Sequence, residues 1–410
     1  MTAIYNFVKW DTTFYKIMRF KVILILLLLV TGCRTREVPL QIQKDIDSIA
    51  VKWVPDEREG ICRFTVNMLA GDALVIKGET NLPEAKNEII SYLGNTGLQI
   101  FDSLKILPDP SGTEKRWGLV TVSVCNIKSK PSFASEQVSQ AVMGTPVKIL
   151  KTGGSWLLIQ TPDHYLGWTT DSSISEMDED EIAEWKLSDR LIYTCKSGDI
   201  MSETDGSGVI SDITAGAVLQ KISESRDYYT VELPDGRRGI VSKKETAEFD
   251  KWCAEIKPDP DRMIQFAESL NGSPYMWGGT SSKAIDCSGF IKIIFFTGGI
   301  VLARDASQQF SYGEPVDISS SCDSLAPGDL IFFGHLNDKG EKRITHVGMY
   351  IGDTEVIHSS GMVRINSLDS TRINYSSYLK KTIMGARRVI VEDSQKGTES
   401  VAHHSWYNNL

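Results

Sequence analysis

The chain has 410 residues, of which 41% are hydrophobic and 24% are charged, and its net charge at pH 7 is −9. This length is enough for two to four domains, and the composition is typical of globular domains with apolar cores. The negative net charge and the lack of a basic patch argue against a nucleic-acid partner.

The N-terminal segment has the pattern of an export signal. Arg19 and Lys21 precede nine apolar residues and then the stretch "VTGC", which ends at Cys33. The apolar run is too short to span a membrane, so residues 1–33 are predicted to be a signal peptide, with residues 1–17 ahead of the true start. The ending resembles a bacterial lipobox, which implies acylation of Cys33 and a lipid anchor. We expect an exported, lipid-anchored protein of the cell envelope, in the periplasm or on a membrane surface. Ordinary secretion and a chance apolar strand are the alternatives.

Residues 41–112 have the pattern of a small α/β region. The stretches "ICRFTVNML" (61–69) and "LQIFDSLKIL" (98–107) have the pattern of strands. Between them, "LPEAKNEIISYLG" (82–94) predicts a helix with acidic residues early and a glycine at its end. This region carries no recognisable chemistry.

An internal repeat follows. "MGTPVKIL" (143–150) recurs as "AGAVLQKI" (215–222), and "WLLIQTPDHYLGW" recurs as "YYTVELPDGRRGI", each at an offset of 72 residues. Short alternating strands and a Pro-Asp turn in both copies predict two small all-β units, at 117–172 and 188–245. Their pattern resembles the bacterial SH3-like domains of cell-wall enzymes. Two generic β-barrels are the alternative.

The last folded unit is expected at 258–392, after the proline-containing linker "IKPDPDR". It contains "AIDCSGF" ahead of a long apolar run, so Cys287 is predicted to begin a buried helix, with Asp286 and Ser288 at its cap or in its first turn. The partial positive charge of a helix N-terminus should lower the pKa of the thiol. A buried, inert cysteine is the alternative. The tail 393–410 lacks periodicity and is predicted to be disordered.

Two histidines are candidates for a base and its partner. "RITHVGMYIGDTEVIHSSG" predicts a β-hairpin with its turn at residues 352 and 353, which places His346 opposite or diagonal to His358 on one face. A cysteine nucleophile requires a base, and the base requires a group that orients it. The hairpin therefore supplies what Cys287 lacks.

Six motifs, in this order and spacing, resemble the NlpC-type papain-like cell-wall cysteine peptidases: "PYMWGG" (274–279), "DCSGF" (286–290), "RDASQQ" (304–309), "LAPGDLIFF" (325–333), "HVGMYIGD" (346–353) and "VIHSS" (356–360). The resemblance implies Cys287 as nucleophile, His346 as general base and His358 as the third member. It also implies that Tyr275, with the backbone N–H of Cys287, stabilises the oxyanion. The predicted fold is multidomain: an α+β papain-like catalytic domain preceded by two small all-β SH3-like barrels and a small α/β N-terminal region.

With two SH3-like units in front, the chain resembles one subgroup, the γ-D-glutamyl-L-diamino acid endopeptidases, or dipeptidyl-peptidases VI. This implies cleavage between D-glutamate and meso-diaminopimelate or L-lysine in peptidoglycan stem peptides with a free N-terminal L-Ala, for murein peptide recycling. In the subgroup, an acidic set beside the first SH3-like domain holds the free amine. The candidate substrate contacts are Asp305, which matches the family acid, and Glu136, Tyr165, Asp286 and Ser288. Ala306 stands where the family commonly has serine, which puts one hydrogen bond in doubt.

Two other functions stay open from the sequence. One is a remodelling hydrolase of intact peptidoglycan, and the other is a non-catalytic lipoprotein that binds wall peptides. A metal site built from Cys287, His346 and His358 lacks metal-type spacing. We expect no metal, no cofactor and a monomer that acts on peptidoglycan-derived peptides.

Overall fold

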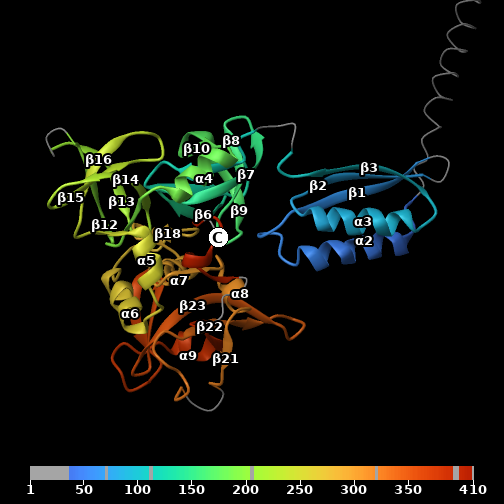
Figure 1. The fold of residues 1–410 in the computed structure, drawn as a ribbon. Coiled ribbons are helices and arrows are strands. Elements are labelled where there is room, and N and C mark those ends of the chain that lie inside the picture. The colour runs from blue at the N-terminus through green and yellow to red at the C-terminus, as the bar shows by residue number, and fades with distance from the viewer. Residues whose placement is uncertain are drawn as a thin grey trace, which may run out of the picture. The chain divides into compact units, whose positions relative to one another are not determined.

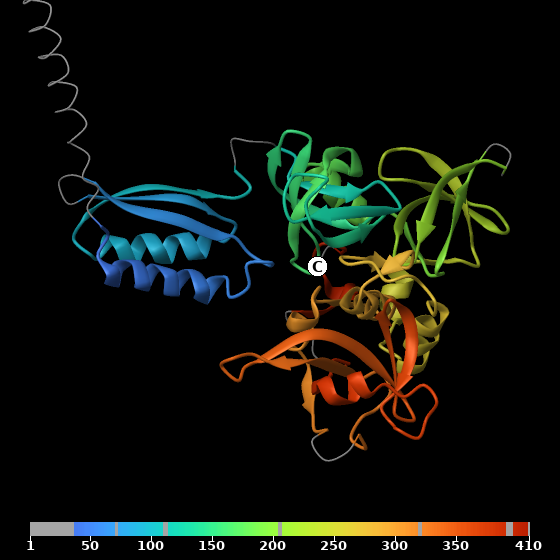
Figure 2. The same ribbon diagram turned by 180° about the vertical axis from the view of Figure 1, so that it is seen from behind.

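The computed structural model describes residues 37–69, 73–109, 114–203, 207–318, 322–390 and 397–408 (Figure 1, Figure 2). The predicted signal peptide and its acylation site, Cys33, lie outside the described residues. The described chain forms two compact units. One comprises the residues up to Pro55 with Ile61–Ile106, and the other comprises Asp56–Gly60 with Leu107 and the residues that follow. Within the described ranges, no helix is both long enough and apolar enough to cross a bilayer.

The first unit is a three-stranded sheet with two helices, as the α/β prediction for this region requires. β1 (Cys62–Leu69) pairs antiparallel with β2 (Ala73–Thr80), which pairs parallel with β3 (Gln99–Ile106). The parallel pair needs a crossover, and α3 (Pro83–Gly94) supplies it. α2 (Leu40–Trp53) lies beside α3 on the same face of the sheet (Figure 1). Their apolar faces enclose one core, made by Ile46, Leu74, Ile76, Ile89 and Leu93.

The first SH3-like unit is one antiparallel sheet of seven strands, in the order β10-β4-β7-β8-β9-β5-β6. Its strands are β4 (Trp117–Val120), β5 (Val124–Lys128), β6 (Gln137–Val142), β7 (Pro146–Gly153), β8 (Trp156–Gln160), β9 (Leu166–Thr170) and β10 (Ile174–Met177). In the part of the chain that the structure describes, no pairing joins β10 to β6. The all-β prediction is therefore confirmed, whereas a closed hydrogen-bonded barrel is not seen. The short helix η1 (Asp171–Ser173) precedes β10, and α4 (Glu179–Leu187) follows it.

The second SH3-like unit has seven strands in the order β13-β12-β16-β15-β14-β11-β17. They are β11 (Arg190–Tyr193), β12 (Ser197–Met201), β13 (Val209–Thr214), β14 (Val218–Glu224), β15 (Tyr228–Glu232), β16 (Arg238–Ser242) and β17 (Thr246–Glu248). Its hairpin β14–β15 repeats the register of β7–β8 at the offset of 72, including a register shift at the same step. The matching pairs are Ile149 with Ile159 and Lys221 with Val231. Gly144 and Gly216 both have positive φ, 75° and 84°, at equivalent turns, so the predicted internal repeat is confirmed.

The catalytic unit is α+β, as predicted. Its central antiparallel sheet has the order β21-β26-β22-β23-β24-β25. These strands are β21 (Glu314–Val316), β22 (Leu330–Leu336), β23 (Lys342–Gly352), β24 (Glu355–Ser360), β25 (Met362–Ser367) and β26 (Ile383–Arg388). The helices are α5 (Phe249–Glu255), α6 (Pro260–Ser269), α7 (Cys287–Thr297), α8 (Ala306–Gln309) and α9 (Ser377–Thr382). β18 (Thr280–Ser281) and β19 (Ala284–Ile285) form a small hairpin before α7. α7 is apolar on most sides because it packs between this sheet and neighbouring helices, where eight of its residues are buried.

The prediction that the tail is disordered is wrong for residues 397–408, the part of it that the structure describes. β27 (Thr398–Ser400) pairs antiparallel with β20 (Ile300–Leu302), and η2 (Val401–His403) follows. Trp406 and Tyr407 are buried, and the Trp406 ring lies edge-on to Trp117, with 5.2 Å between ring centroids. The tail has no period of its own because its apolar residues pack against other elements, so pattern analysis did not detect its order.

Candidate active site

Cys287 is the first residue of α7, and its cap is the predicted one. The Asp286 carboxylate accepts a hydrogen bond from the backbone N–H of Gly289 at 2.7 Å. Cys287 is 9% exposed, and the backbone N–H groups of Ser288 and Val347 donate toward its sulfur. Because Val347 follows His346, the N-terminus of α7 faces β23 at that histidine.

The two predicted histidines meet on one face of the hairpin. His346 lies on β23 and His358 on β24, and His346 Nε2 is 2.8 Å from His358 Nδ1. The pair is diagonal, since His358 lies across from Gly348, where a Cβ would come within 3.0 Å of the His358 Cβ. His358 Nε2 is in turn 3.0 Å from Asn366 Oδ1 on β25. Because Nε2 of His346 is bonded to His358, its other ring nitrogen, Nδ1, is the one available to the thiol.

The pKa values of the thiol and the imidazole correct one prediction. Burial, with the negative charge of Asp286, raises the pKa of Cys287 to about 12, although the backbone donors act in the opposite direction. Burial, with the nearby His358, lowers the pKa of His346 to about 3. The helix N-terminus was expected to lower the thiol pKa, but desolvation outweighs it. At neutral pH the resting pair is therefore a thiol beside a neutral imidazole.

Tyr275 lies close to the thiol. Its backbone N–H donates to the Gly361 carbonyl at 3.0 Å, which ties the "PYMWGG" turn to the end of β24. Burial, with the charges of Cys287 and Asp286, raises the pKa of its phenol to about 12. The phenol is thus a protonated hydrogen-bond donor near the sulfur, as an oxyanion role would require.

Asp286 and Ser288, two of the candidate substrate contacts, have partners inside the protein. Both are 5% exposed. The buried Arg304 guanidinium donates to Asp286 Oδ2 at 2.5 Å and to Ser288 Oγ at 2.9 Å. Arg304 also donates to Ser139 Oγ, on β6 of the first SH3-like unit, at 3.1 Å. This network joins that unit to the helix that begins at Cys287.

Of the three remaining candidate contacts, the structure brings two together. Tyr165, 6% exposed, donates from its hydroxyl to Asp305 Oδ2 at 3.2 Å. Burial, with the Asp305 charge, raises the pKa of Tyr165. Glu136, on the connection between β5 and β6, is exposed, and its Oε1 accepts a hydrogen bond from Trp277 Nε1 at 2.9 Å. Its role as a substrate contact stays a prediction.

Arg58 is a residue of this site that sequence reasoning missed. Its guanidinium donates to Asp305 Oδ2 at 2.6 Å and to Ser307 Oγ at 3.2 Å. It also pairs with Asp56, from NH2 to Oδ2 at 2.5 Å. The only sequence signal is a cluster of charges, "DERE", between a predicted helix and a predicted strand.

The comparisons with known proteins agree with this geometry. Residues 272–388 match the NlpC/P60 family, and residues 122–175 match the bacterial SH3 domain. The gamma-D-glutamyl-L-lysine dipeptidyl-peptidase of Bacillus cereus is 30% identical over 303 residues, which are 70% of this chain and 86% of that protein. The chain belongs to the NlpC/P60 family. It is a hydrolase of the cysteine peptidase class.

Two further relatives of this NlpC/P60 chain are informative. Dipeptidyl-peptidase 6 of Lysinibacillus sphaericus is 26% identical over 276 residues, which are 65% of this chain and 96% of that protein. The crystal structure of an NlpC/P60 family protein from Bacillus cereus aligns with a TM-score of 0.58 and 24% identity, over 67% of this chain and all of that chain. The structural match supports the fold alone.

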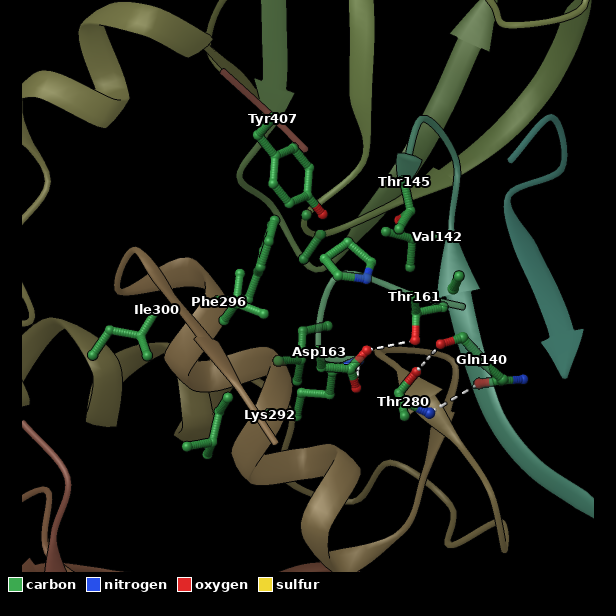
Figure 3. Close-up of a pocket in the computed structure, with 17 residues that line it drawn as sticks. Gln140, Val142, Thr145, Thr161, Asp163, Thr280, Lys292, Phe296, Ile300 and Tyr407 are labelled. Carbon is green, nitrogen blue, oxygen red and sulfur yellow. Dashed lines mark hydrogen bonds and ion pairs between the residues drawn. The ribbon is translucent and has the colours of Figure 1, made fainter. Parts of the chain in front are cut away.

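A cavity away from the NlpC/P60 catalytic residues lies where the first SH3-like unit, α7 and the tail meet (Figure 3). Its lining includes Asp163, which pairs with Lys292 on α7 at 2.9 Å and accepts from Thr161 Oγ1 at 2.5 Å. Burial raises the pKa of Asp163, but the Lys292 charge and this hydrogen bond outweigh it, so the net shift is downward. Tyr407 of the tail lines the same cavity. The buried ion pair fixes the SH3-like unit on the helix that carries Cys287.

Proposed function

We propose that the chain hydrolyses the γ-D-glutamyl–diamino acid bond of peptidoglycan stem peptides that have a free N-terminal L-Ala, with meso-diaminopimelate or L-lysine in the next position. The observation that carries this proposal is the relay from the N-terminus of α7 to His346, His358 and Asn366. The names of the relatives support the choice of bond, since one is a gamma-D-glutamyl-L-lysine dipeptidyl-peptidase. The role would be murein peptide recycling.

In the proposed mechanism, Cys287 Sγ attacks the γ-carbonyl carbon of D-glutamate while its proton passes to His346 Nδ1. The Tyr275 hydroxyl and the Cys287 backbone N–H hold the oxyanion. His346 then gives the proton to the departing amine, and the C–N bond breaks to leave a thioester. Water attacks the thioester with His346 taking its proton, and the released thiolate recovers that proton. No metal or cofactor enters these steps.

The amine end of the substrate would meet Asp305 and Tyr165. A carboxylate and a phenol at 3.2 Å from each other form a polar wall on which an ammonium ion can pair. A stem peptide still joined to sugar by an amide lacks that charge, so it would bind with less affinity. Asp286 and Ser288 would act through their bonds to Arg304, by positioning α7.

A second function, remodelling of intact peptidoglycan, is favoured by one observation. Arg58 already places a cation on Asp305. If this contact persists when substrate binds, the site does not need the ammonium, and peptides without a free amine are cut as well.

One comparison separates the two functions. The chain without residues 1–33 is given L-Ala-γ-D-Glu-meso-diaminopimelate with a free or an acetylated N-terminus. We expect a higher kcat/KM for the free-amine peptide, and no turnover of either peptide by Cys287→Ala with an unchanged circular dichroism spectrum. Equal cleavage of both peptides would favour the second function, remodelling of intact peptidoglycan. Turnover by Cys287→Ala would refute the mechanism.

We propose that the chain is lipid-anchored at the cell envelope, a location that the export-signal pattern ending at Cys33 supports. That it is a monomer is a separate prediction. Membrane fractionation of cells that carry Cys33→Ala tests the anchor: the variant should leave the membrane fraction. Gel filtration tests the monomer.

A further inference from the structure

The segment Asp56–Gly60 is attached to the first SH3-like unit. The Leu166 N–H donates to the Arg58 carbonyl at 2.8 Å, and Gln160 Nε2 donates to the Glu59 carbonyl at 2.9 Å. These bonds attach the segment to the strands on either side of Tyr165.

A second attachment reaches the short helix that follows Asp305. Gln308 Nε2 donates to Asp56 Oδ2 at 3.0 Å and to Glu59 Oε1 at 2.9 Å. The segment is thus fixed by both its backbone and its side chains, and its position sets where the Arg58 guanidinium lies.

The carboxylate of Asp305 is surrounded by donors. Oδ2 accepts from Arg58 at 2.6 Å and from the Tyr165 hydroxyl at 3.2 Å, and Oδ1 lies 3.8 Å from Arg304. A substrate ammonium that pairs with Asp305 must therefore replace Arg58 or lie next to its like charge. Either event lowers the affinity for the ammonium.

We propose that Arg58 is a specificity-determining residue, which competes with the substrate's ammonium for Asp305 and so reduces the selection of free-amine peptides. This rests on the proposed function in one respect, the placement of the substrate amine at Asp305. Asp56 pairs with Nε and NH2 of the Arg58 guanidinium, whereas Asp305 pairs with NH1. Asp56 can therefore still hold the guanidinium after Arg58 has left Asp305. Arg58 is half-exposed, so its release needs no unfolding.

Binding measurements test this without turnover. The peptide L-Ala-γ-D-Glu and its N-acetyl form are titrated by calorimetry into the Cys287→Ala protein, with Arg58 intact or replaced by glutamine. We expect Arg58→Gln to lower the Kd of the free-amine peptide by about tenfold, the size of one charge-assisted hydrogen bond, and to leave the Kd of the acetylated peptide unchanged. Arg262→Gln is the control, because Arg262 is an exposed arginine of α6 whose side chain lies 3.7 Å from Asp259.

A double-mutant cycle makes the test specific. In an Asp305→Asn background, Arg58→Gln should change neither Kd, because the contested carboxylate is gone. Three outcomes would overturn the proposal. Arg58→Gln binds the free-amine peptide no more tightly, it gains affinity equally for both peptides, or neither peptide binds. Hydrolysis is scored separately: selective binding without cleavage would count against the proposed function alone.

Discussion

Cys287 and His346 have pKa values displaced in opposite directions, and both displacements disfavour the charged form. A thiolate and an imidazolium formed together offset each other's charge, so proton transfer between them is easier than either ionisation alone. The resting enzyme is therefore protected from reactions that need a free thiolate. Attack begins when substrate brings the carbonyl carbon to the sulfur.

The lowered pKa of His346 predicts a pH dependence of stability. Its pKa is 6.5 unfolded and about 3 folded, so below pH 6.5 the unfolded chain binds one more proton and stability falls as the pH falls. Between pH 7 and pH 5 this histidine should account for a loss of about 2 kcal/mol in the free energy of unfolding. The free energy of unfolding is measured with urea at pH 7 and at pH 5 for the wild type and for His346→Gln. The variant should lose less stability between the two pH values than the wild type does, by this amount.

The matched control for this measurement is His335→Gln, since His335 is exposed at the end of β22. That variant should keep the pH dependence of the wild type. If the free energy of unfolding falls equally between pH 7 and pH 5 in His346→Gln and in the wild type, burial does not suppress the charge of His346.

Sequence reasoning identified the reacting residues but not their ionisation. The flank of Cys287 and the alternation around His346 depend on local pattern, which the sequence shows directly. The thiol pKa depends on how completely α7 is buried and on the orientation of Asp286, and both are set by tertiary packing. Arg58 was missed for the same reason, because its partners in the catalytic unit, Asp305 and Ser307, lie 247 and 249 positions away in the chain.

At the scale of elements, three adjacent strands hold the relay. His358 pairs with Arg364 across β24 and β25, so Asn366, two residues further, lies diagonal to His358 on the same face. The Asn366 amide is itself held by a bond from Nδ2 to the Asn374 carbonyl at 2.9 Å. Sequence reasoning predicted the β23–β24 hairpin but not the third strand's asparagine, because the Ser360-Gly361 turn signal after β24 does not by itself show that Asn366 faces the histidines.

Removal of this amide predicts a kinetic effect. Asn366→Ala takes away the acceptor that orients His358, so kcat should fall by about tenfold, as for one lost hydrogen bond to a group that becomes charged during the reaction. KM should change little, because Asn366 is placed behind the histidines. Steady-state kinetics on the free-amine peptide measures both.

Asn337→Ala is the control for the asparagine variant, since Asn337 lies in the exposed turn between β22 and β23 and bonds only within that turn among the contacts described. A wild-type kcat in Asn366→Ala would show that His346 and His358 are held without the third strand.

At the scale of the whole molecule, the tail helps to join the SH3-like units to the catalytic unit. Trp406 and Tyr407 belong to one apolar cluster with Trp117 of the first SH3-like unit, Val218 of the second and Val301 beside α7. Domain order could be predicted from the repeat and the motifs. This junction could not, since its residues come from segments that are distant in the chain and share no common pattern.

Loss of the Trp406 ring should therefore weaken the fold. The ring is 6% exposed, and Trp406→Ala should lower the free energy of unfolding by about 3–5 kcal/mol, the usual cost of removing a buried aromatic side chain. The midpoint of urea unfolding measures this. Tyr378→Ala, at a side chain that is 65% exposed, should shift the midpoint little. An unchanged midpoint in Trp406→Ala would show that the tail is dispensable.

The equal strand register of the two SH3-like units indicates that they arose by duplication. Both copies have a residue with positive φ after the Pro-Asp turn, Gly236 in the second and His164 in the first. The next residue is Arg237 in the second copy, which pairs with its neighbour Asp235, and Tyr165 in the first. An ancestral module that was duplicated would explain both the shared irregular step and this difference. The two copies now use these positions differently: Arg237 also donates to the Ile210 carbonyl of its own unit, whereas His164 contacts Glu399 and Tyr165 donates to Asp305.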